Sequence, residues 1–280
     1  MIRPGLCSVS FRDLDIDEVV ARSADASLAC IEWAGDVHVA PGDLAAAARA
    51  RECTRAAGLE IASYGSYLRF DDTDESARTT GGQVLTAARE LDAPRVRVWA
   101  GSQGSAQTSP DQRRHIVGRM RRFADDAATA GIEVGLEFHG GTLTDEVAST
   151  LQLLDEIDRV TVRTYWQPPV GLRTDQALAT LRPVLSRSST IHVFSWWPRT
   201  ERLPLAERAE LWQKVFGMLA REGSDRDALL EFVPDDDPAV LAREARTLRE
   251  LIDGTQAPSP DEGSVADVSP DDGSADGAAR

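Results

Sequence analysis

Strand-like runs alternate with helix-like segments eight times between residues 6 and 252. Residues 95–99, R-V-R-V-W, show the period-two alternation of a strand. Asp43 after Pro-Gly and Gly58 mark a helix start and a helix stop. Eight strand–helix units predict a closed (β/α)8 TIM barrel of the α/β class. A doubly wound sheet is the alternative, but no GxGxxG follows the first strand.

The predicted elements define one domain and a tail. The strands are expected at 6–10, 28–33, 59–64, 95–99, 134–138, 162–166, 190–194 and 228–233. The helices are expected at 16–24, 43–57, 74–91, 109–130, 144–157, 174–181, 205–221 and 238–252. Residues 1–252 are therefore assigned to a single barrel domain. Residues 253–280 hold seven acidic residues, one arginine and almost no large apolar side chains, which predicts a disordered acidic tail.

The net charge of −15 and the pI of about 4.7 limit the classes of partner. An acidic surface repels polyanions, so nucleic acid is not expected as a partner. No apolar run is long enough to cross a bilayer, and residues 1–13 lack the apolar core of a signal peptide. Cys7, Cys30 and Cys53 form no CxxC pair, which favours a reduced, cytoplasmic setting.

The strongest candidate site is the stretch G-L-E-F-H-G at residues 135–140. Side chains alternate along a strand, so Glu137 and His139 share the face opposite Leu136 and Phe138. The carboxyl ends of the strands form the active face of a TIM barrel. A carboxylate and an imidazole at this point indicate a site, although ordinary loop residues would also fit so short a motif.

Other predicted strand ends carry polar or aromatic side chains as well. The candidates for substrate contact are Glu32, Trp33, His38, Tyr64, Arg97, Trp99, His139, Trp166, Trp197 and Arg199. Arg97 alternates inward with Trp99, and it suits either an acidic substrate group or an ion pair with Glu32 or Glu137. Tryptophans at a barrel mouth suit stacking on a sugar ring, with packing at the rim as the alternative.

Glu137, His192 and Glu231 share one further pattern, because each follows an apolar strand in V-G-L-E, T-I-H and A-L-L-E. Two carboxylates and one imidazole at one mouth can hold a divalent ion such as Mn²⁺ or Mg²⁺. They equally suit an acid–base pair held by hydrogen bonds. A metal site needs more ligands than these three residues supply.

With these motifs the chain resembles the sugar phosphate isomerase/epimerase superfamily, the xylose-isomerase-like TIM barrels. The resemblance covers residues 1–252 and rests on I-E-W, G-L-E-F-H, I-H-V-F-S-W and L-L-E-F at the second, fifth, seventh and eighth strand ends. It implies a divalent metal held by Glu137, Gln167, His192 and Glu231. It also implies that Glu137 and Glu231 are the catalytic proton-transfer pair.

Gln167 departs from the family pattern, which usually has aspartate before proline at this position. An amide oxygen can bind a metal but brings no charge. Mn²⁺ or Mg²⁺ is therefore expected to bind weakly or to be absent. The family's substrate-contacting histidine shortly after that aspartate is missing too, since the chain reads P-P-V at 168–170.

The leading interpretation is an isomerase or epimerase of a small sugar or sugar phosphate, working by glutamate-mediated proton transfer at a divalent metal. The second is a dehydratase of a keto-inositol or similar cyclic polyol, with His139 or His38 as the acid for the leaving hydroxyl. The third is a metal-free barrel that only binds a sugar or a partner. A multi-zinc DNA-repair endonuclease is disfavoured, because the acidic chain has four histidines. The expected partner is a small-molecule carbohydrate, with no membrane partner and a homodimer as the candidate assembly.

Overall fold

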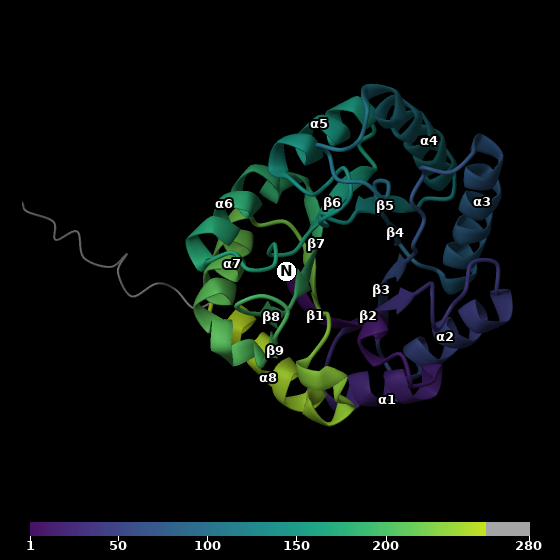
Figure 1. Cartoon of the computed structure of the whole chain (residues 1–280). Helices are drawn as coiled ribbons and strands as arrows, with labels where there is room; N and C mark the ends of the chain where they lie inside the picture. Colours follow the sequence, from purple (N-terminus) through teal and green to yellow (C-terminus); the bar gives the residue numbers. More distant parts are fainter. Residues whose placement is uncertain (256–280) are drawn as a thin grey trace, which may run out of the picture.

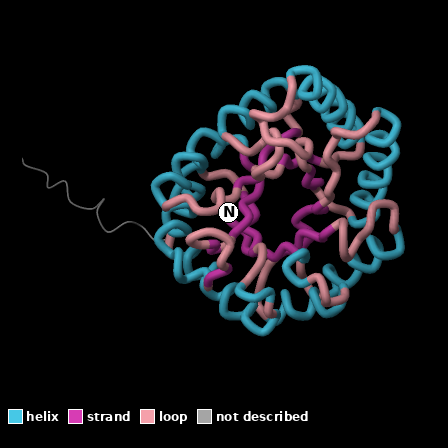
Figure 2. Tube along the Cα trace, in the orientation of Figure 1, coloured by secondary structure: helices cyan, strands magenta, loops and turns pink. Residues whose placement is uncertain are grey.

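The structure, a computed structural model, describes residues 1–255 of the chain. Eight parallel strands close into a barrel in the order β1-β10-β7-β6-β5-β4-β3-β2. The α-helices form a ring around this barrel, as Figures 1 and 2 show. The predicted TIM barrel is therefore confirmed. The predicted acidic tail lies outside the described residues, apart from residues 253–255.

The elements have the following bounds. The barrel strands are β1 Ile2–Cys7, β2 Cys30–Ala34, β3 Glu60–Gly65, β4 Arg95–Val98, β5 Glu133–Leu136, β6 Val162–Trp166, β7 Ser188–Val193 and β10 Arg226–Leu230. The helices are α1 Ile16–Asp25, α2 Leu44–Ala56, α3 Asp74–Leu91, α4 Pro110–Thr129, α5 Val147–Ile157, α6 Thr174–Val184, α7 Ala209–Glu222 and α8 Leu241–Asp253. Within residues 1–255, no helix is both long and apolar enough to span a membrane.

Two hydrophobic clusters decide which strand face points inward. The larger cluster packs strand residues such as Val96 and Leu136 against the helices. The smaller one contains Cys30 and Leu229, which lie two residues before Glu32 and Glu231 and so share their strand faces. Burying one aliphatic side chain stabilises the fold by about 1.5–3 kcal/mol. The larger cluster therefore fixes the strand orientation that turns the acidic residues toward the barrel axis.

The first strand begins earlier than the sequence predicts. β1 ends at Cys7, and residues Ser8–Phe11 form the 3₁₀ turn η1. The hydroxyl of Ser8 accepts a hydrogen bond from the Ala34 N–H at 2.8 Å, and the hydroxyl of Ser10 accepts one from the Phe232 N–H at 2.8 Å. The S-V-S run alternates like a strand, but its hydroxyls bind the backbone at the end of β2 and just beyond β10 instead.

Among the helices whose bounds differ from prediction, α5 and α6 do so for identifiable local reasons. α5 starts later, at Val147, because two threonines hold the preceding loop: Thr142 donates to the His139 carbonyl at 2.7 Å, and Thr144 donates to the Glu137 carbonyl. α6 continues through Pro183 to its end at Val184. In the last turn a proline removes one backbone hydrogen bond, which the rest of the helix tolerates.

A short antiparallel pair that the sequence analysis did not predict follows β7. It consists of β8 Ser195–Trp196 and β9 Arg202–Leu203. Each strand has two residues, which is too short for a period-two pattern to be visible. The pair brings Trp196 to the mouth of the barrel.

Candidate metal and acid–base site

Glu137, His192 and Glu231 meet at the carboxyl end of the barrel. Each offers a ligand atom, and these atoms all lie within 4.8 Å of one another. Glu137 follows β5, where its N–H donates to the Val98 carbonyl at 3.1 Å, and Glu231 follows β10, where its N–H donates to the Val193 carbonyl at 3.0 Å. The strand ends thus aim the side chains at one point, as the alternation of side chains predicts.

Gln167 joins this cluster. Its Oε1 lies 3.0 Å from Nδ1 of His192, and the residue lines the cavity at the mouth. The segment after β6 therefore remains directed toward the site, although the amide replaces a carboxylate.

Arg97 places a guanidinium among these inward residues, and two carboxylates hold it. Its Nε donates to Glu32 Oε1 at 3.0 Å, and its Nη1 donates to Glu137 Oε2. The side chain is 2% exposed. Burial alone would lower the pKa of Arg97, but Glu137 and Glu32 outweigh burial and raise that pKa well above its usual value. Of the two roles that the sequence leaves open, the structure shows the ion pair.

Glu32 lies beneath the cavity and does not line it. It accepts hydrogen bonds from Arg97 and from the Ser63 hydroxyl, the latter at 2.6 Å. Burial would raise the pKa of Glu32, but Arg97, His192 and Ser63 together outweigh this effect and hold the pKa well below its ordinary value. Glu32 is therefore a buried anion behind the site, and the expectation that it touches substrate does not fit this position.

The donor set fits a hard divalent ion. Carboxylate oxygens, an imidazole nitrogen and an amide oxygen are ligands that Mn²⁺ accepts. Three carboxylates, Glu32, Glu137 and Glu231, face one guanidinium, Arg97, which leaves two negative charges when His192 is neutral. A divalent ion would balance these two charges, so the neutral Gln167 does not leave the site short of negative charge.

A cavity of about 530 Å³ opens above the cluster. Aromatic side chains form much of its wall, and several polar groups reach it. The lining includes Tyr67, Arg97, Trp99, Glu137, Phe138, His139, Asp145, Gln167, Phe194, Trp196, Glu231 and Phe232. This size and composition suit a small polar ring compound.

His139 stacks on Trp99 in the cavity wall. The ring centroids are 4.3 Å apart and the ring planes differ by 29°. Nδ1 of His139 lies 2.6 Å from the Gly140 carbonyl, which can only accept, so Nδ1 carries the proton. In the neutral ring the lone pair therefore lies on Nε2, which makes His139 a base held in a fixed orientation.

Four other predicted contact residues lie away from the cavity. Trp33 donates its indole N–H to Thr54 at 3.2 Å, and Trp166 donates to Thr180 at 3.1 Å, so both rings pack against the helix layer. Tyr64 donates to the Val39 carbonyl at 2.7 Å. His38 lies between Ser8 and the Leu14 carbonyl. These four residues are part of the packed core and do not line the cavity.

Trp197 and Arg199 lie between β8 and β9 and also miss the cavity. The Trp197 ring lies 5.1 Å from the Arg208 guanidinium. Arg199 is exposed, and its N–H donates to Glu201 at 3.0 Å. The turn between the two short strands carries both side chains outward.

Several residues of the site were not among the sequence candidates. Tyr67, Asp145, Phe194 and Phe232 line the cavity from positions beyond the barrel strands. Ser63 and Cys7 lie beside Glu32 below it. The alternation of side chains along β3 could have indicated that Ser63 points inward. A first strand that ends at Cys7 would have indicated the same for the Cys7 thiol. Burial raises the pKa of Cys7 to about 12, so its thiol is neutral at physiological pH.

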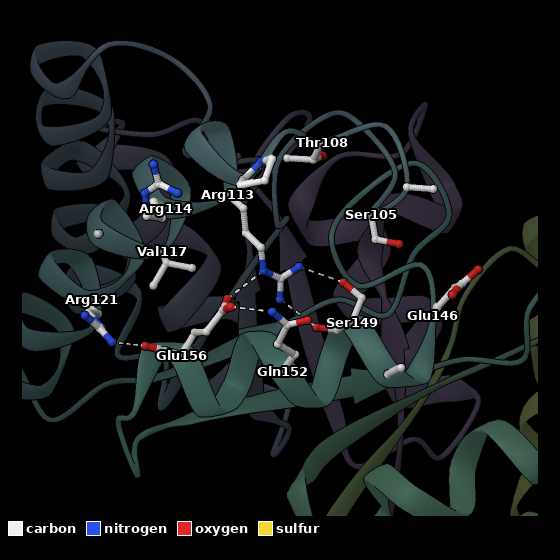
Figure 3. A pocket seen from close by; sticks show the side chains of 14 residues that line it. Ser105, Thr108, Arg113, Arg114, Val117, Arg121, Glu146, Ser149, Gln152 and Glu156 are labelled. Atoms are coloured by element: carbon white, nitrogen blue, oxygen red, sulfur yellow. Dashed lines mark hydrogen bonds and ion pairs between the residues drawn. The ribbon is translucent and has the colours of Figure 1, made fainter.

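A larger hollow of about 840 Å³ lies outside the barrel, between α4 and α5 (Figure 3). Some of its polar groups are already paired with one another. Arg113 donates to Glu156 at 2.7 Å and to the Ser149 hydroxyl at 3.0 Å. The smaller cavity at the barrel mouth holds the converging ionisable groups, so it is the better candidate for chemistry.

Known proteins agree with this architecture. A curated relative, 3-dehydroshikimate dehydratase of Bacillus anthracis, is 29% identical over 159 residues, which span 55% of this chain and 57% of the relative. The crystal structure of the probable 3-DHS dehydratase AsbF from Bacillus anthracis superposes with a TM-score of 0.75 at 22% identity, covering 89% of this chain and 99% of that chain. An L-ribulose 3-epimerase structure superposes with a TM-score of 0.71 at 16% identity, covering 91% and 96%.

At these identities the two superpositions show the fold alone. The sequence profile of the xylose isomerase-like TIM barrel family matches residues 20–251, which is most of the chain. The chain therefore belongs to the xylose isomerase-like TIM barrel family.

Proposed function

We propose that this protein is a metal-assisted dehydratase, a lyase that removes water from a small cyclic polyhydroxy ketone of the 3-dehydroshikimate type. The observation that carries the proposal is the orientation of His139 at the cavity wall, where Nδ1 faces the Gly140 carbonyl and the neutral ring therefore carries its lone pair on Nε2. Glu137 is held by Arg97, and Glu231 lies 3.3 Å from His192. His139 is therefore the base least committed to other groups of the site. The partial match to a 3-dehydroshikimate dehydratase supports the same class of reaction.

The reaction needs a base beside a carbon next to the ketone. His139 Nε2 takes the proton from that carbon, and the C–H electrons pass into an enolate. As the enolate collapses, its electrons form the new C=C bond and the C–O bond of the β-hydroxyl breaks. The imidazolium of His139 returns its proton to the departing hydroxide, so water leaves and His139 is neutral again.

The remaining residues bind and orient. Glu137, Gln167, His192 and Glu231 would hold a divalent ion, which when bound polarises the substrate carbonyl and acidifies the neighbouring C–H. Trp99 keeps the His139 ring in its plane through the stacked contact. The aromatic walls exclude water from the enolate and present apolar faces to a flat ring.

The direct test is incubation of Mn²⁺-loaded protein with 3-dehydroshikimate. Loss of water from this hydroxylated cyclohexenone carboxylate leads to an aromatic dihydroxybenzoate, whose ultraviolet absorbance is easily followed. We expect the aromatic product to form and the chelator-treated protein to be inactive. If no product forms while ketoses or inososes are turned over, the dehydratase assignment is wrong.

An epimerase of a keto-sugar is the second candidate, because Glu137 and Glu231 both line the cavity and can form a two-base pair. Solvent deuterium separates the two functions. An epimerase returns a proton to the same carbon and so incorporates deuterium into a product with an unchanged formula. We expect ketoses incubated in D₂O to show little incorporation, and rapid incorporation would favour the epimerase. Saturable binding of a sugar without turnover would favour a binding protein.

The position of Gln167 gives a separate prediction. Gln167→Asp adds a third carboxylate ligand, beside Glu137 and Glu231, at a position whose oxygen already lies 3.0 Å from His192 Nδ1. We expect Mn²⁺ binding to tighten by about tenfold or more, because attraction to a divalent ion is strong in a low-dielectric pocket. Calorimetric titration of substrate-free protein measures this change. Equal affinity in the variant and the wild type would remove Gln167 from the ligand set.

A further inference from the structure

The imidazole of His192 stands between two groups of side chains. Its Nδ1 lies 3.0 Å from Gln167 Oε1 and 3.3 Å from Glu231 Oε2. Its Nε2 points the other way, toward Glu32, whose Oε1 is 3.6 Å distant. Nε2 is buried and has no hydrogen-bond partner among the described residues. His192 itself is 0% exposed, so water does not reach this nitrogen.

We propose that Glu32 is a positioning residue that accepts a hydrogen bond from Nε2–H of His192 and thereby directs the lone pair of Nδ1 to the metal ligands. This inference rests on the metal-assisted function proposed above. Glu32 does not line the cavity, so it acts through His192 and not on the substrate.

The argument begins with the tautomer. An imidazole nitrogen that binds a metal must carry its lone pair, so the neutral ring must place its proton on the other nitrogen. If Nδ1 faces the metal with Gln167 and Glu231, the proton belongs on Nε2. A buried N–H without an acceptor is costly, by about 1–3 kcal/mol. The cluster around Nε2 offers the Glu32 carboxylate and the Cys7 thiol, and a thiol is a weak acceptor.

Glu32 is itself held rigidly. Ser63 donates to one of its oxygens at 2.6 Å, and Arg97 donates to the other at 3.0 Å. The oxygen that Arg97 contacts is also the one nearest His192. Arg97 binds Glu137 with its other end. One buried carboxylate therefore fixes two ligands of the cluster, Glu137 through Arg97 and His192 directly.

The test is Mn²⁺ affinity of the full-length, substrate-free protein, measured by calorimetry and by the electron paramagnetic resonance signal of free Mn²⁺. Glu32→Gln keeps the size of the side chain but weakens the acceptor, and we expect it to weaken Mn²⁺ binding by about 10–100-fold. Glu60→Gln is the matched control, because Glu60 begins β3 at the opposite end of the barrel and pairs with Arg3. The Mn²⁺ affinity of Glu60→Gln should stay within about twofold of the wild-type affinity, because surface ion pairs contribute little energy.

A second variant tests the orientation of His192 without changing the net charge of the cluster. It also keeps the proposal testable if Glu32→Gln misfolds. Glu32→Leu/Arg97→Met removes both partners of the buried ion pair, so the net charge of the cluster is unchanged and Glu137 is the one carboxylate that loses a partner. We expect this variant to bind Mn²⁺ at least about tenfold more weakly than the wild type, because Nε2–H has lost its acceptor. Affinity equal to the wild type in either variant would overturn the proposal.

The tautomer can also be observed directly. In ¹⁵N spectra of the Mg²⁺-loaded wild type, we expect His192 to be protonated at Nε2 and unprotonated at Nδ1. Protonation at Nδ1 in that state would contradict the proposal. None of these measurements uses a substrate, so they remain decisive even if the protein does not dehydrate 3-dehydroshikimate.

Discussion

Replacing His139 with asparagine should lower kcat for dehydration by about 10²–10⁴-fold, which is the usual contribution of a general base. Asparagine keeps a polar side chain of similar size but has no basic nitrogen. KM should change little, because the metal ligands and the aromatic walls remain. Steady-state formation of the aromatic product measures both constants.

The matched control is His115→Asn, the same substitution at an exposed position on α4. It should retain wild-type kinetics. A decrease in kcat of less than about threefold for His139→Asn would be far below the contribution of a general base. In that case Glu137 or Glu231 would be the residue that moves the proton, and the two-base epimerase would become the better interpretation.

Arg97→Met should be the most destabilising single change at the site. The guanidinium is 2% exposed and is paired with Glu32 and Glu137, so its loss leaves two buried carboxylates uncompensated. Removing one partner of a buried ion pair typically costs about 3–5 kcal/mol. Urea denaturation of metal-free protein measures the free energy of unfolding.

Arg49→Met provides the control, because Arg49 and Asp17 form an exposed ion pair with side-chain exposures of 58% and 54%. Its cost should be about 0–1 kcal/mol, as is usual for surface pairs. Glu32→Leu/Arg97→Met should lose less stability than Arg97→Met alone, since one of the uncompensated charges is gone. If Arg97→Met matched the surface control, the buried pair would not be important for stability.

Side-chain alternation explains which of the sequence candidates line the cavity and which lie elsewhere. It predicts that Glu137 and His139 share an inward face, and that Arg97 and Trp99 do so on β4. The same rule, applied strictly, would have excluded Trp33, because its neighbour Glu32 points inward. Proximity to a strand end therefore predicts a cavity residue less well than the alternation of side chains does.

Other features depend on contacts that no local pattern encodes. Whether Arg97 binds a ligand or pairs with two carboxylates depends on how three strands meet in space. Register shifts between β2 and β3 and between β6 and β7 change which side chains lie level across the sheet. The cavity residues Phe194 and Phe232 lie beyond their strands, where backbone direction is set by tertiary contacts.

The order of the strands around the barrel has a consequence for biosynthesis. β10 pairs with β1 from Ile2 and Arg226 to Leu6 and Leu230, and its other edge pairs with β7. Of the eight barrel strands, β10 is thus the last to be synthesised, and it joins the two open edges and places Glu231 at the site. A nascent chain that already contains Glu137 and His192 still lacks a complete set of ligands. Under the proposed metal-assisted function, metal binding would begin only when the ring of strands is closed, so metal retention would report completed folding of the whole barrel.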